Sequence, residues 1–362
     1  MSRHRQAWCA VAIIAFTASW SSGENAALQH LQASRMSMAC LYTIDAYSDD
    51  ADRLSRTLDE ALDEVDRIDR LMSHYKPESP LSRINRDAAA SPVTVEPELF
   101  DFIARSIDYS RESQGAFDIT VGPLMKAWGF FRGEGRLASD RDVETARELV
   151  GSSHVVLDAS HHTIRFDRRG VELDLGGIAK GYAVDRVVGI LTAAHVTAAL
   201  VSAGGSTIYG LGAPPGHPGW TVSIQDPVDS RKVAREVELR DRALSVAGSS
   251  EKSFEVNGVS YSHIMDPRTG RPVQGVLSVA VITKTGTEGD ALDDAFFVLG
   301  PDQSRTYLKR LRDVQTFFLL PDTRRGYVVV EEQALRFIAA SRWRALALAG
   351  AGDGAPAQTE KC

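Results

Sequence analysis

Apolar residues recur at intervals of three and four along one stretch near the N-terminus, at Leu54, Leu58, Leu62, Val65, Ile68 and Leu71. Charged residues fill most of the positions between them, so the spacing predicts a long amphipathic helix with one apolar stripe. Ser48, Asp49 and Asp50 precede the stripe and can cap this helix. Upstream, residues alternate in a way that predicts a strand over 38–46 with one buried side, formed by Met38, Cys40, Tyr42, Ile44 and Ala46.

The rest of the chain mixes helical and extended patterns. Further helices are predicted from Pro97 to near Gly115 and over 139–150, 178–194 and 287–299. Strands are predicted at 154–158, 162–166, 171–175, 198–202, 316–320 and 326–330, and residues 73–85 are predicted to form a loop. Asn257-Gly258 between alternating residues is a hairpin signal. Because no strict βαβ repeat is present, the pattern predicts an α+β fold rather than a doubly wound parallel sheet.

The composition and the two ends of the chain indicate what kind of partner, location and domain organisation to expect. The 362 residues are 43% hydrophobic and 25% charged, with a net charge of −7 and no Lys/Arg-rich block, which argues against a nucleic-acid partner. A basic start followed by a short apolar run predicts a signal peptide over residues 1–25, with an uncleaved anchor as the alternative. No lipid-anchoring motif surrounds Cys9. One catalytic domain is predicted over 26–344, and a disordered tail over 345–362.

An acidic stretch, GDALDDAFFVLG over 289–300, is the first candidate for chemistry. Asp290 and Asp294 are four residues apart and share one face of the predicted helix, with Asp293 beside them. Like charges at this spacing repel unless a cation separates them, and Mg²⁺ accepts oxygen ligands. A solvated acidic helix face is the alternative, although the following AFFVLG indicates burial.

Glycine turns form the second candidate. DLGGIAKGYAVD, residues 174–185, matches neither a P-loop nor a dinucleotide-binding fingerprint. Backbone N–H groups at the start of a helix still favour an anion, and Lys180 falls in the first turn. The alternative is a tight corner with a surface lysine. SAGGS, residues 202–206, is a second turn that permits close approach of a ligand or another backbone.

Two further positions carry groups suited to ligand contact. His263 precedes the turn of DPRTG at a predicted strand end, which suits proton transfer or substrate contact. Phe117 and Asp118 follow a helix-ending glycine. The phenylalanine ring can stack on a nucleotide or flavin, and the carboxylate can bind a polar edge of that ligand. A core phenylalanine beside a capping aspartate has the same pattern.

The order of these motifs resembles the FAD:protein FMN transferase family, also called ApbE. The resemblance runs through SHYKPESPLSRIN, GAFDITVGPLMKAWGF, ELDLGGIAKGYAVD, LVSAGGS, HIMDPRTGRPV and GDALDDAFFVLG, over roughly residues 36–320. It implies a two-lobed α+β architecture of the tunnelling-fold type, with the FAD cleft between the lobes and Mg²⁺ at the diphosphate. It also implies transfer of FMN from FAD to a Thr or Ser hydroxyl of a target protein, with release of AMP.

The resemblance also implies site residues. FAD contacts are expected at Met38, Tyr75, Ala116, Phe117, Asp118, Asp174, Lys180, His263 and Ile264. The Mg²⁺ ligands would be the Asp290 and Asp294 carboxylates and the Gly177 backbone carbonyl, and His263 would take part in catalysis. The chain departs from the family pattern at Met38-Ala39-Cys40, at Ser206, at Asp294 and over 247–254.

Partners and location follow from the same resemblance. The acceptors are expected to be redox proteins or subunits in the periplasm, and peripheral association with the inner membrane is left open. Two alternatives use the same residues: an FAD diphosphatase that releases FMN and AMP, and a non-catalytic flavin-binding protein.

Overall fold

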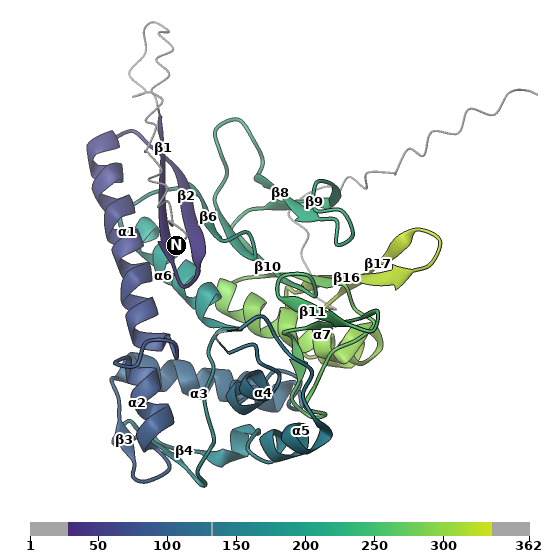
Figure 1. Ribbon diagram of the computed structural model, residues 1–362. Helices are drawn as coiled ribbons and strands as arrows, with labels where there is room; N and C mark the ends of the chain where they lie inside the picture. Colours follow the sequence, from purple (N-terminus) through teal and green to yellow (C-terminus); the bar gives the residue numbers. More distant parts are fainter. Residues whose placement is uncertain (1–27, 132, 335–362) are drawn as a thin grey trace, which may run out of the picture.

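The computed structural model describes residues 28–131 and 133–334 (Figure 1). The expected signal peptide over 1–25 and the expected tail over 345–362 lie outside the described residues. None of the helices in the described part of the chain combines the length and the apolar character that crossing a membrane requires.

One eight-stranded sheet organises the molecule. Every neighbouring pair of strands in it is antiparallel. Its strands, in spatial order, are β1 (Gln29–Ser37), β2 (Cys40–Ser48), β6 (Ala198–Ala203), β7 (Thr207–Leu211), β10 (Arg242–Gly248), β15 (Ser278–Thr283), β16 (Gln315–Asp322) and β17 (Gly326–Gln333). An antiparallel sheet together with several α-helices confirms the predicted α+β class.

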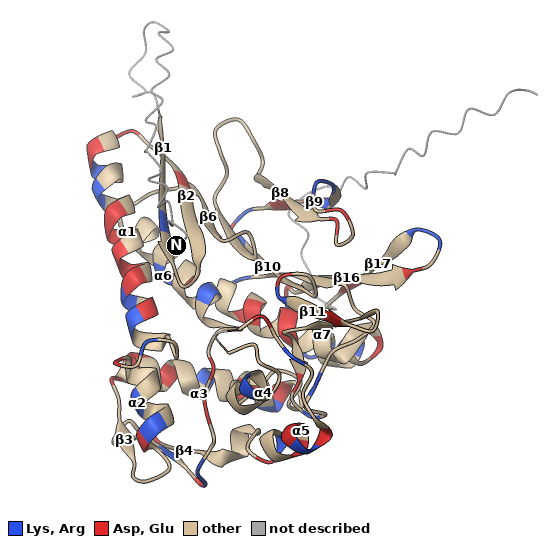
Figure 2. Cartoon of the chain, viewed as in Figure 1, with Lys and Arg blue, Asp and Glu red and all other residues tan. Residues whose placement is uncertain are grey.

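Three long helices cover one face of this sheet: α1 (Ala51–Met72), α6 (Ala179–Ala193) and α7 (Gly286–Leu308). The apolar stripe of α1 is buried as predicted, and Figure 2 shows acidic and basic residues along the length of this helix. The hairpin of β8 (Trp220–Gln225) and β9 (Val233–Leu239) covers the other face. Strand β15 is consequently buried along its length, since Val279 and Val281 pack in the α7 core and Ala280 and Ile282 pack with the hairpin.

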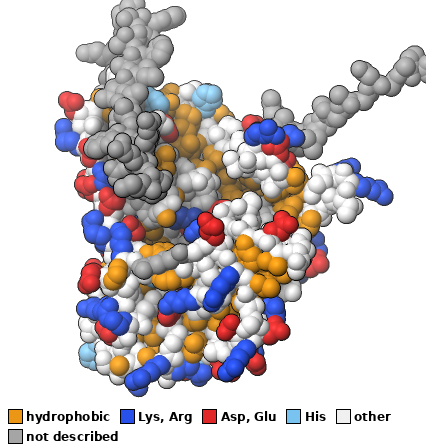
Figure 3. Space-filling view, in the orientation of Figure 1, with side chains coloured by type: hydrophobic (Ala, Val, Ile, Leu, Met, Phe, Trp, Pro, Cys, Tyr) orange, Lys and Arg blue, Asp and Glu red, His pale blue; other side chains and the backbone are white. Residues whose placement is uncertain are grey.

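A second group of elements lies below the sheet in Figure 1, in agreement with the two expected lobes. Its core includes Trp128, Phe130, Val143 and Met265, and the Trp128 indole donates to the Gly270 carbonyl at 2.9 Å. The group comprises α2 (Pro80–Asp87), α3 (Pro97–Glu112), α4 (Gly122–Ala127), α5 (Asp140–Arg147), a 3₁₀ turn (Ser152–His154), the sheet β3 (Val93–Thr94), β5 (Thr163–Phe166) and β4 (Val155–Asp158), and the hairpins β11 (Ser253–Val256) with β12 (Val259–Ser262) and β13 (Met265–Asp266) with β14 (Arg271–Pro272). On the face shown in Figure 3, basic and acidic side chains are interspersed.

Local sequence signals are confirmed where they involve caps and turns. Asp50 caps α1 by accepting from the Arg53 N–H at 2.9 Å. Asn257 and Gly258 both have positive φ, 54° and 77°, which is the conformation of the predicted two-residue hairpin turn.

The N-terminal strand prediction is wrong at its start. Met38 and Ala39 form a turn with φ of 49° and 61°, and β2 begins only at Cys40. The preceding strand, β1, is absent from the sequence-based prediction. It lies at the edge of the sheet and is largely exposed, so its residues carry little alternation of apolar and polar character.

Two other local predictions are also wrong. The expected loop over 73–85 ends in helix α2, which Ser79 caps by accepting from the Ser82 N–H at 3.0 Å, with Pro80 in the first turn. The expected strand over 171–175 is not a strand. The N–H and C=O of Leu173 bond to the Asn85 side chain at 2.8 and 2.9 Å, so these groups join no strand ladder.

Candidate functional site

Helix α7 starts against the first two turns of α6. Asp185 of α6 accepts hydrogen bonds from the Gly286 N–H at 2.6 Å, and from the Thr287 N–H at 2.9 Å and hydroxyl at 2.5 Å. A side chain on Gly181 would overlap the Gly286 carbonyl, so the two backbones touch at this point. This contact brings the last residues of DLGGIAKGYAVD to the acidic stretch, more than a hundred positions further along the chain.

Asp290 lies at this junction and is buried. Its carboxylate accepts from the Gly181 N–H at 2.6 Å and from the Thr207 and Ser245 hydroxyls at 2.7 and 2.9 Å. Burial raises the pKa of Asp290 to about 6, against the lowering effect of Lys180 and these hydrogen bonds. A second positive charge near the carboxylate would stabilise its ionised form.

Asp294 lies one helical turn further on and is half-buried. A Cβ added to Gly177 would overlap its Oδ2 atom, so the carboxylate rests directly against the glycine turn. Burial and the charge of Asp290 raise the pKa of Asp294 to about 7. For the buried Asp293, burial and both neighbouring carboxylates raise the pKa well above its ordinary value.

These oxygen donors fit a hard divalent cation. Within residues 28–131 and 133–334, no three His, Cys, Asp or Glu side chains are grouped so as to hold a metal ion by themselves. Two carboxylates and the Gly177 carbonyl would therefore need further oxygen ligands, which a bound diphosphate can supply. Burial raises both pKa values, and the charge of Asp290 adds to the shift of Asp294, so a bound Mg²⁺ would favour the ionised form of both carboxylates.

Lys180 connects the two glycine turns. Its ammonium donates to the Ser206 hydroxyl at 2.6 Å, which ties the start of α6 to the SAGGS turn. Burial lowers the pKa of Lys180, but nearby carboxylates, Asp290 foremost, outweigh this effect and raise the pKa above its ordinary value. The ammonium is therefore a permanent positive charge beside the acidic helix.

Met38 belongs to the same corner of the molecule. The hairpin turn that carries it follows β1, and its sulfur lies 3.2 Å from the Tyr42 hydroxyl. Gly204 of the SAGGS turn donates to the Leu41 carbonyl at 2.9 Å, and a side chain on Gly204 would overlap Cys40. The β1–β2 turn and the second glycine turn are thus packed together.

Asp174 lies at the other end of the first glycine turn. Its Oδ1 atom is 3.1 Å from Nδ1 of His74 and accepts from the Gly176 N–H at 2.8 Å. His74 is not among the site residues predicted from the sequence, because a lone histidine in a polar stretch carries no signal until its partner is known. The adjacent Tyr75 is exposed and stacks on Phe131 with ring centroids 5.2 Å apart.

The segment 115–118 is more buried than expected for a loop that contacts a ligand. Ala116 and Phe117 are 2% and 5% exposed, and a Cβ on Gly177 would lie 3.7 Å from the Phe117 ring. The Asp118 carboxylate accepts from Thr120 and Ser110 and from the N–H of Ser152. Asp118 thus holds its own turn together, and contact of this segment with FAD stays a prediction.

His263 follows strand β12 and is half-buried. Its N–H donates to the Lys252 carbonyl at 2.9 Å, and its Nδ1 lies 3.3 Å from the same oxygen. Burial lowers the pKa of His263 to about 4, and the charges of Lys252, Lys180 and Asp174 also act on it. The neighbouring Ile264 is buried in the core beside α7.

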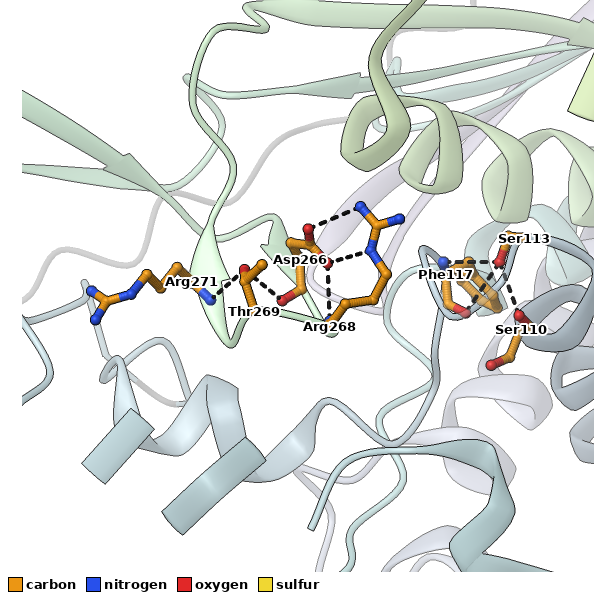
Figure 4. A network of polar contacts seen from close by, with 7 residues as sticks. All are labelled: Ser110, Ser113, Phe117, Asp266, Arg268, Thr269 and Arg271. Atoms are coloured by element: carbon orange, nitrogen blue, oxygen red, sulfur yellow. Dashed lines mark hydrogen bonds and ion pairs between the residues drawn. The ribbon is translucent and has the colours of Figure 1, made fainter. Parts of the chain in front are cut away.

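The loop after His263 is anchored by its own polar contacts. The Asp266 carboxylate accepts two hydrogen bonds from the Arg268 guanidinium, at 2.9 and 3.0 Å (Figure 4). Arg268 also lies beside Gly115, where a Cβ would be 3.8 Å from its side chain. The turn that follows His263 therefore lies beside Gly115, just after α3, next to the network of Ser110, Ser113 and Phe117.

The sequence and the structure both match known proteins. A family model described as the ApbE family matches residues 38–318. The FAD:protein FMN transferase of Escherichia coli K12 is 31% identical over 271 residues, 72% of this chain and 76% of its own. The FAD:protein FMN transferase of Treponema pallidum is 31% identical over 320 residues, 84% and 88% of the two chains.

Solved structures agree with these sequence matches. The ApbE protein of Thermotoga maritima superposes with a TM-score of 0.76 at 28% identity, over 85% of this chain and 97% of its own. The flavinyl transferase ApbE of Pseudomonas stutzeri superposes with a TM-score of 0.75 at 29% identity, over 85% and 96%. The chain therefore belongs to the ApbE family of FAD:protein FMN transferases.

Proposed function

We propose that this flavin transferase moves FMN from FAD to a Thr or Ser hydroxyl of an acceptor redox protein, in a Mg²⁺-dependent reaction that releases AMP. The observation that carries the proposal is the contact of the Asp294 carboxylate with the Gly177 backbone, one helical turn from Asp290. A buried carboxylate, a half-buried one and a glycine turn that carries Lys180 suit a cation that binds a diphosphate.

In the proposed reaction, the acceptor oxygen forms a bond to the FMN phosphorus while the bond to the AMP oxygen breaks. A bound Mg²⁺ would withdraw electron density from the diphosphate and orient it. Lys180 adds a fixed positive charge near the diphosphate, where negative charge builds up.

His263 is suited to the acceptor hydroxyl. The Lys252 carbonyl only accepts hydrogen bonds, so its contact with Nδ1 favours the tautomer with the proton on Nδ1. Nε2 is then an acceptor, and the pKa of about 4 keeps the ring neutral at neutral pH. His263 would receive the hydroxyl proton or position the acceptor oxygen.

Substitution of Asp290 tests the proposal. Asp290→Ala should abolish Mg²⁺-dependent transfer, measured as the gain of FMN mass on an acceptor protein incubated with FAD and MgCl₂. Because Ala leaves three buried donors unpaired, Asp290→Asn serves as a second variant that retains the side-chain shape. Asp101→Asn on the exposed side of α3 is the control. Full activity in folded Asp290 variants would refute the metal assignment.

The same assay separates the alternatives. Release of free FMN and AMP without labelled acceptor would indicate an FAD diphosphatase. FAD that stays intact with Mg²⁺ and acceptor present would indicate a flavin-binding protein. The shared names of the relatives, FAD:protein FMN transferase, favour transfer.

We also propose export to the periplasm, where the acceptor proteins would face the enzyme. The support is the basic start and apolar run within residues 1–25. Cell fractionation together with the intact mass of the mature protein tests this location and the cleavage.

A further inference from the structure

His74 forms a buried pair with Asp174. Its Nδ1 lies 3.1 Å from Asp174 Oδ1, and the two side chains are only 8% and 12% exposed. The residues come from distant parts of the chain, the end of α1 and the first glycine turn. Asp174 is among the residues expected to contact FAD, whereas His74 has no role in the proposed function so far.

The second ring nitrogen of His74 has no hydrogen-bond partner among the described residues, although it is buried. Leaving a buried polar atom unpaired costs on the order of 1–3 kcal/mol. Among the residues that the structure describes, this ring therefore has a single polar contact, to Asp174, and an apolar side chain would suit the position better if stability alone mattered. An unpaired buried group calls for an explanation, and contact with a bound ligand is one.

Aromatic rings hold the imidazole in place. The Tyr75 and Phe131 rings have their centroids 4.0 and 5.2 Å from that of His74. On the other side, Asp174 is fixed by its N–H, which donates to the Ile119 carbonyl at 2.7 Å. Both members of the pair consequently have restricted positions, as a group that orients a ligand requires.

The pair leaves one oxygen of Asp174 available. Oδ1 accepts from His74 and from the Gly176 N–H, and no hydrogen bond within the described residues involves Oδ2. Burial acts to raise the pKa of Asp174, but the hydrogen bond and the charge of His74 outweigh it and hold the pKa below its ordinary value. Both side chains line an open pocket of about 230 Å³ with Phe131 and Lys126. An ionised carboxylate with one free oxygen can accept from a hydroxyl or amino group of a ligand there.

We propose that His74 is a positioning residue for flavin nucleotide binding, which holds Asp174 through Oδ1 so that Oδ2 accepts a hydrogen bond from FAD. This inference rests on the proposed function, because FAD is the ligand it requires. His74 acts through Asp174 and takes no part in the transfer of the phosphoryl group. Its loss should weaken FAD binding and leave the turnover of bound FAD intact.

Three His74 variants separate the two nitrogens. His74→Asn retains a donor close to the Nδ1 position, His74→Gln retains one close to the Nε2 position, and His74→Phe keeps only the ring. His161→Phe is the control, because it removes another His–Asp contact, at 2.9 Å to Asp158, in an exposed turn. Each full-length protein is titrated with FAD by flavin fluorescence, and KM for FAD and kcat are measured beside the melting temperature without FAD.

The expected result is a rise of about tenfold to a hundredfold in Kd and KM for FAD in His74→Phe and His74→Gln, the scale of a hydrogen bond to a charged group. In His74→Asn both constants should stay within about threefold of wild type, as in the control, and kcat should change little in every variant.

Two outcomes would overturn the inference. Unchanged FAD affinity in His74→Phe would show that the pair does not orient the ligand. Loss of affinity in His74→Asn equal to that in His74→Phe, with recovery in His74→Gln, would show that the other nitrogen acts. If His74→Phe does not fold, the FAD affinities of His74→Asn and His74→Gln still test the inference, because only His74→Asn should bind FAD like wild type. A wild-type protein that binds no FAD would refute the proposed function together with this inference, whereas the first two outcomes leave the proposed function standing.

Discussion

Gly177→Ala adds one methyl group where the first glycine turn meets the acidic helix. The new Cβ would overlap Oδ2 of Asp294 and would lie 3.7 Å from the ring of Phe117, an ordinary contact distance. Gly177 is not among the residues with positive φ, so alanine can adopt its backbone conformation. The substitution therefore acts mainly on the position of the Asp294 carboxylate.

The effect on folding should be small. Replacing glycine by alanine at an unstrained position stabilises a protein by about 0.4–1 kcal/mol through the unfolded chain. Moving the Asp294 side chain away from its preferred rotamer costs about 0.5–1.5 kcal/mol. These terms nearly cancel, and the free energy of unfolding should stay within about 1 kcal/mol of wild type.

The effect on the proposed metal site should be large. Displacing a carboxylate ligand from the Gly177 carbonyl should weaken Mg²⁺ at least about tenfold, which is about 1.4 kcal/mol. Calorimetric titration of Mg²⁺ in the presence of FAD measures this affinity, and the transfer rate as a function of MgCl₂ concentration gives an independent value.

Gly189→Ala is the matched control, because Gly189 is an exposed residue of α6 with no heavy atom within 4 Å of an added Cβ. It should stabilise the helix by up to about 1 kcal/mol and leave the Mg²⁺ response unchanged. A folded Gly177→Ala protein with wild-type Mg²⁺ affinity would refute the assignment of Gly177 and Asp294 to one cation.

Three further perturbations test other parts of the structure. Asp185→Asn should destabilise the protein by about 1–3 kcal/mol in urea unfolding, because an amide cannot accept all three hydrogen bonds from the start of α7; an unchanged midpoint would argue against this contact. Phe297→Ala should cost about 3–5 kcal/mol, since the ring is fully buried, and a loss below 1 kcal/mol would contradict its place in the core. The pKa of His263 falls from 6.5 to about 4 on folding, so its contribution to stability is present above pH 6.5 and is lost as the pH falls towards 4. Urea midpoints of His263→Gln between pH 4 and 7 should therefore vary less with pH than those of wild type. The same pH dependence in both proteins would contradict a lowered pKa of His263.

Local sequence patterns predict much of the secondary structure correctly. The 3.6-residue spacing of apolar side chains predicts α1, and caps at Asp50 and Ser139 mark the starts of α1 and α5. Such signals depend only on residues close together in the chain, so they can be recognised without knowledge of the fold. They fail at 171–175, where the side chain of Asn85 takes the place of a neighbouring strand.

Long-range pairing limits prediction more severely. Strands β7, β8, β9, β10 and β15 were not predicted, and three of them, β7, β10 and β15, are adjacent interior strands of the main sheet. Strand β15 shows no alternation because helix α7 covers one face and the β8–β9 hairpin covers the other. Burial on both faces is a property of the assembled layers.

In the candidate site, too, local sequence and long-range packing determine different features. The sequence by itself determined the family, through the order of its motifs, and it marked Asp290, Asp294 and Lys180 as candidates for chemistry. The resemblance implied that the glycine turn meets the acidic helix, but only the tertiary structure showed the contacts between them and the pairing of His74 with Asp174. The reason is physical: a carboxylate acquires a shifted pKa and a partner from burial and from charges within a few ångströms, and spacing along the chain does not specify which distant residues fold to that distance.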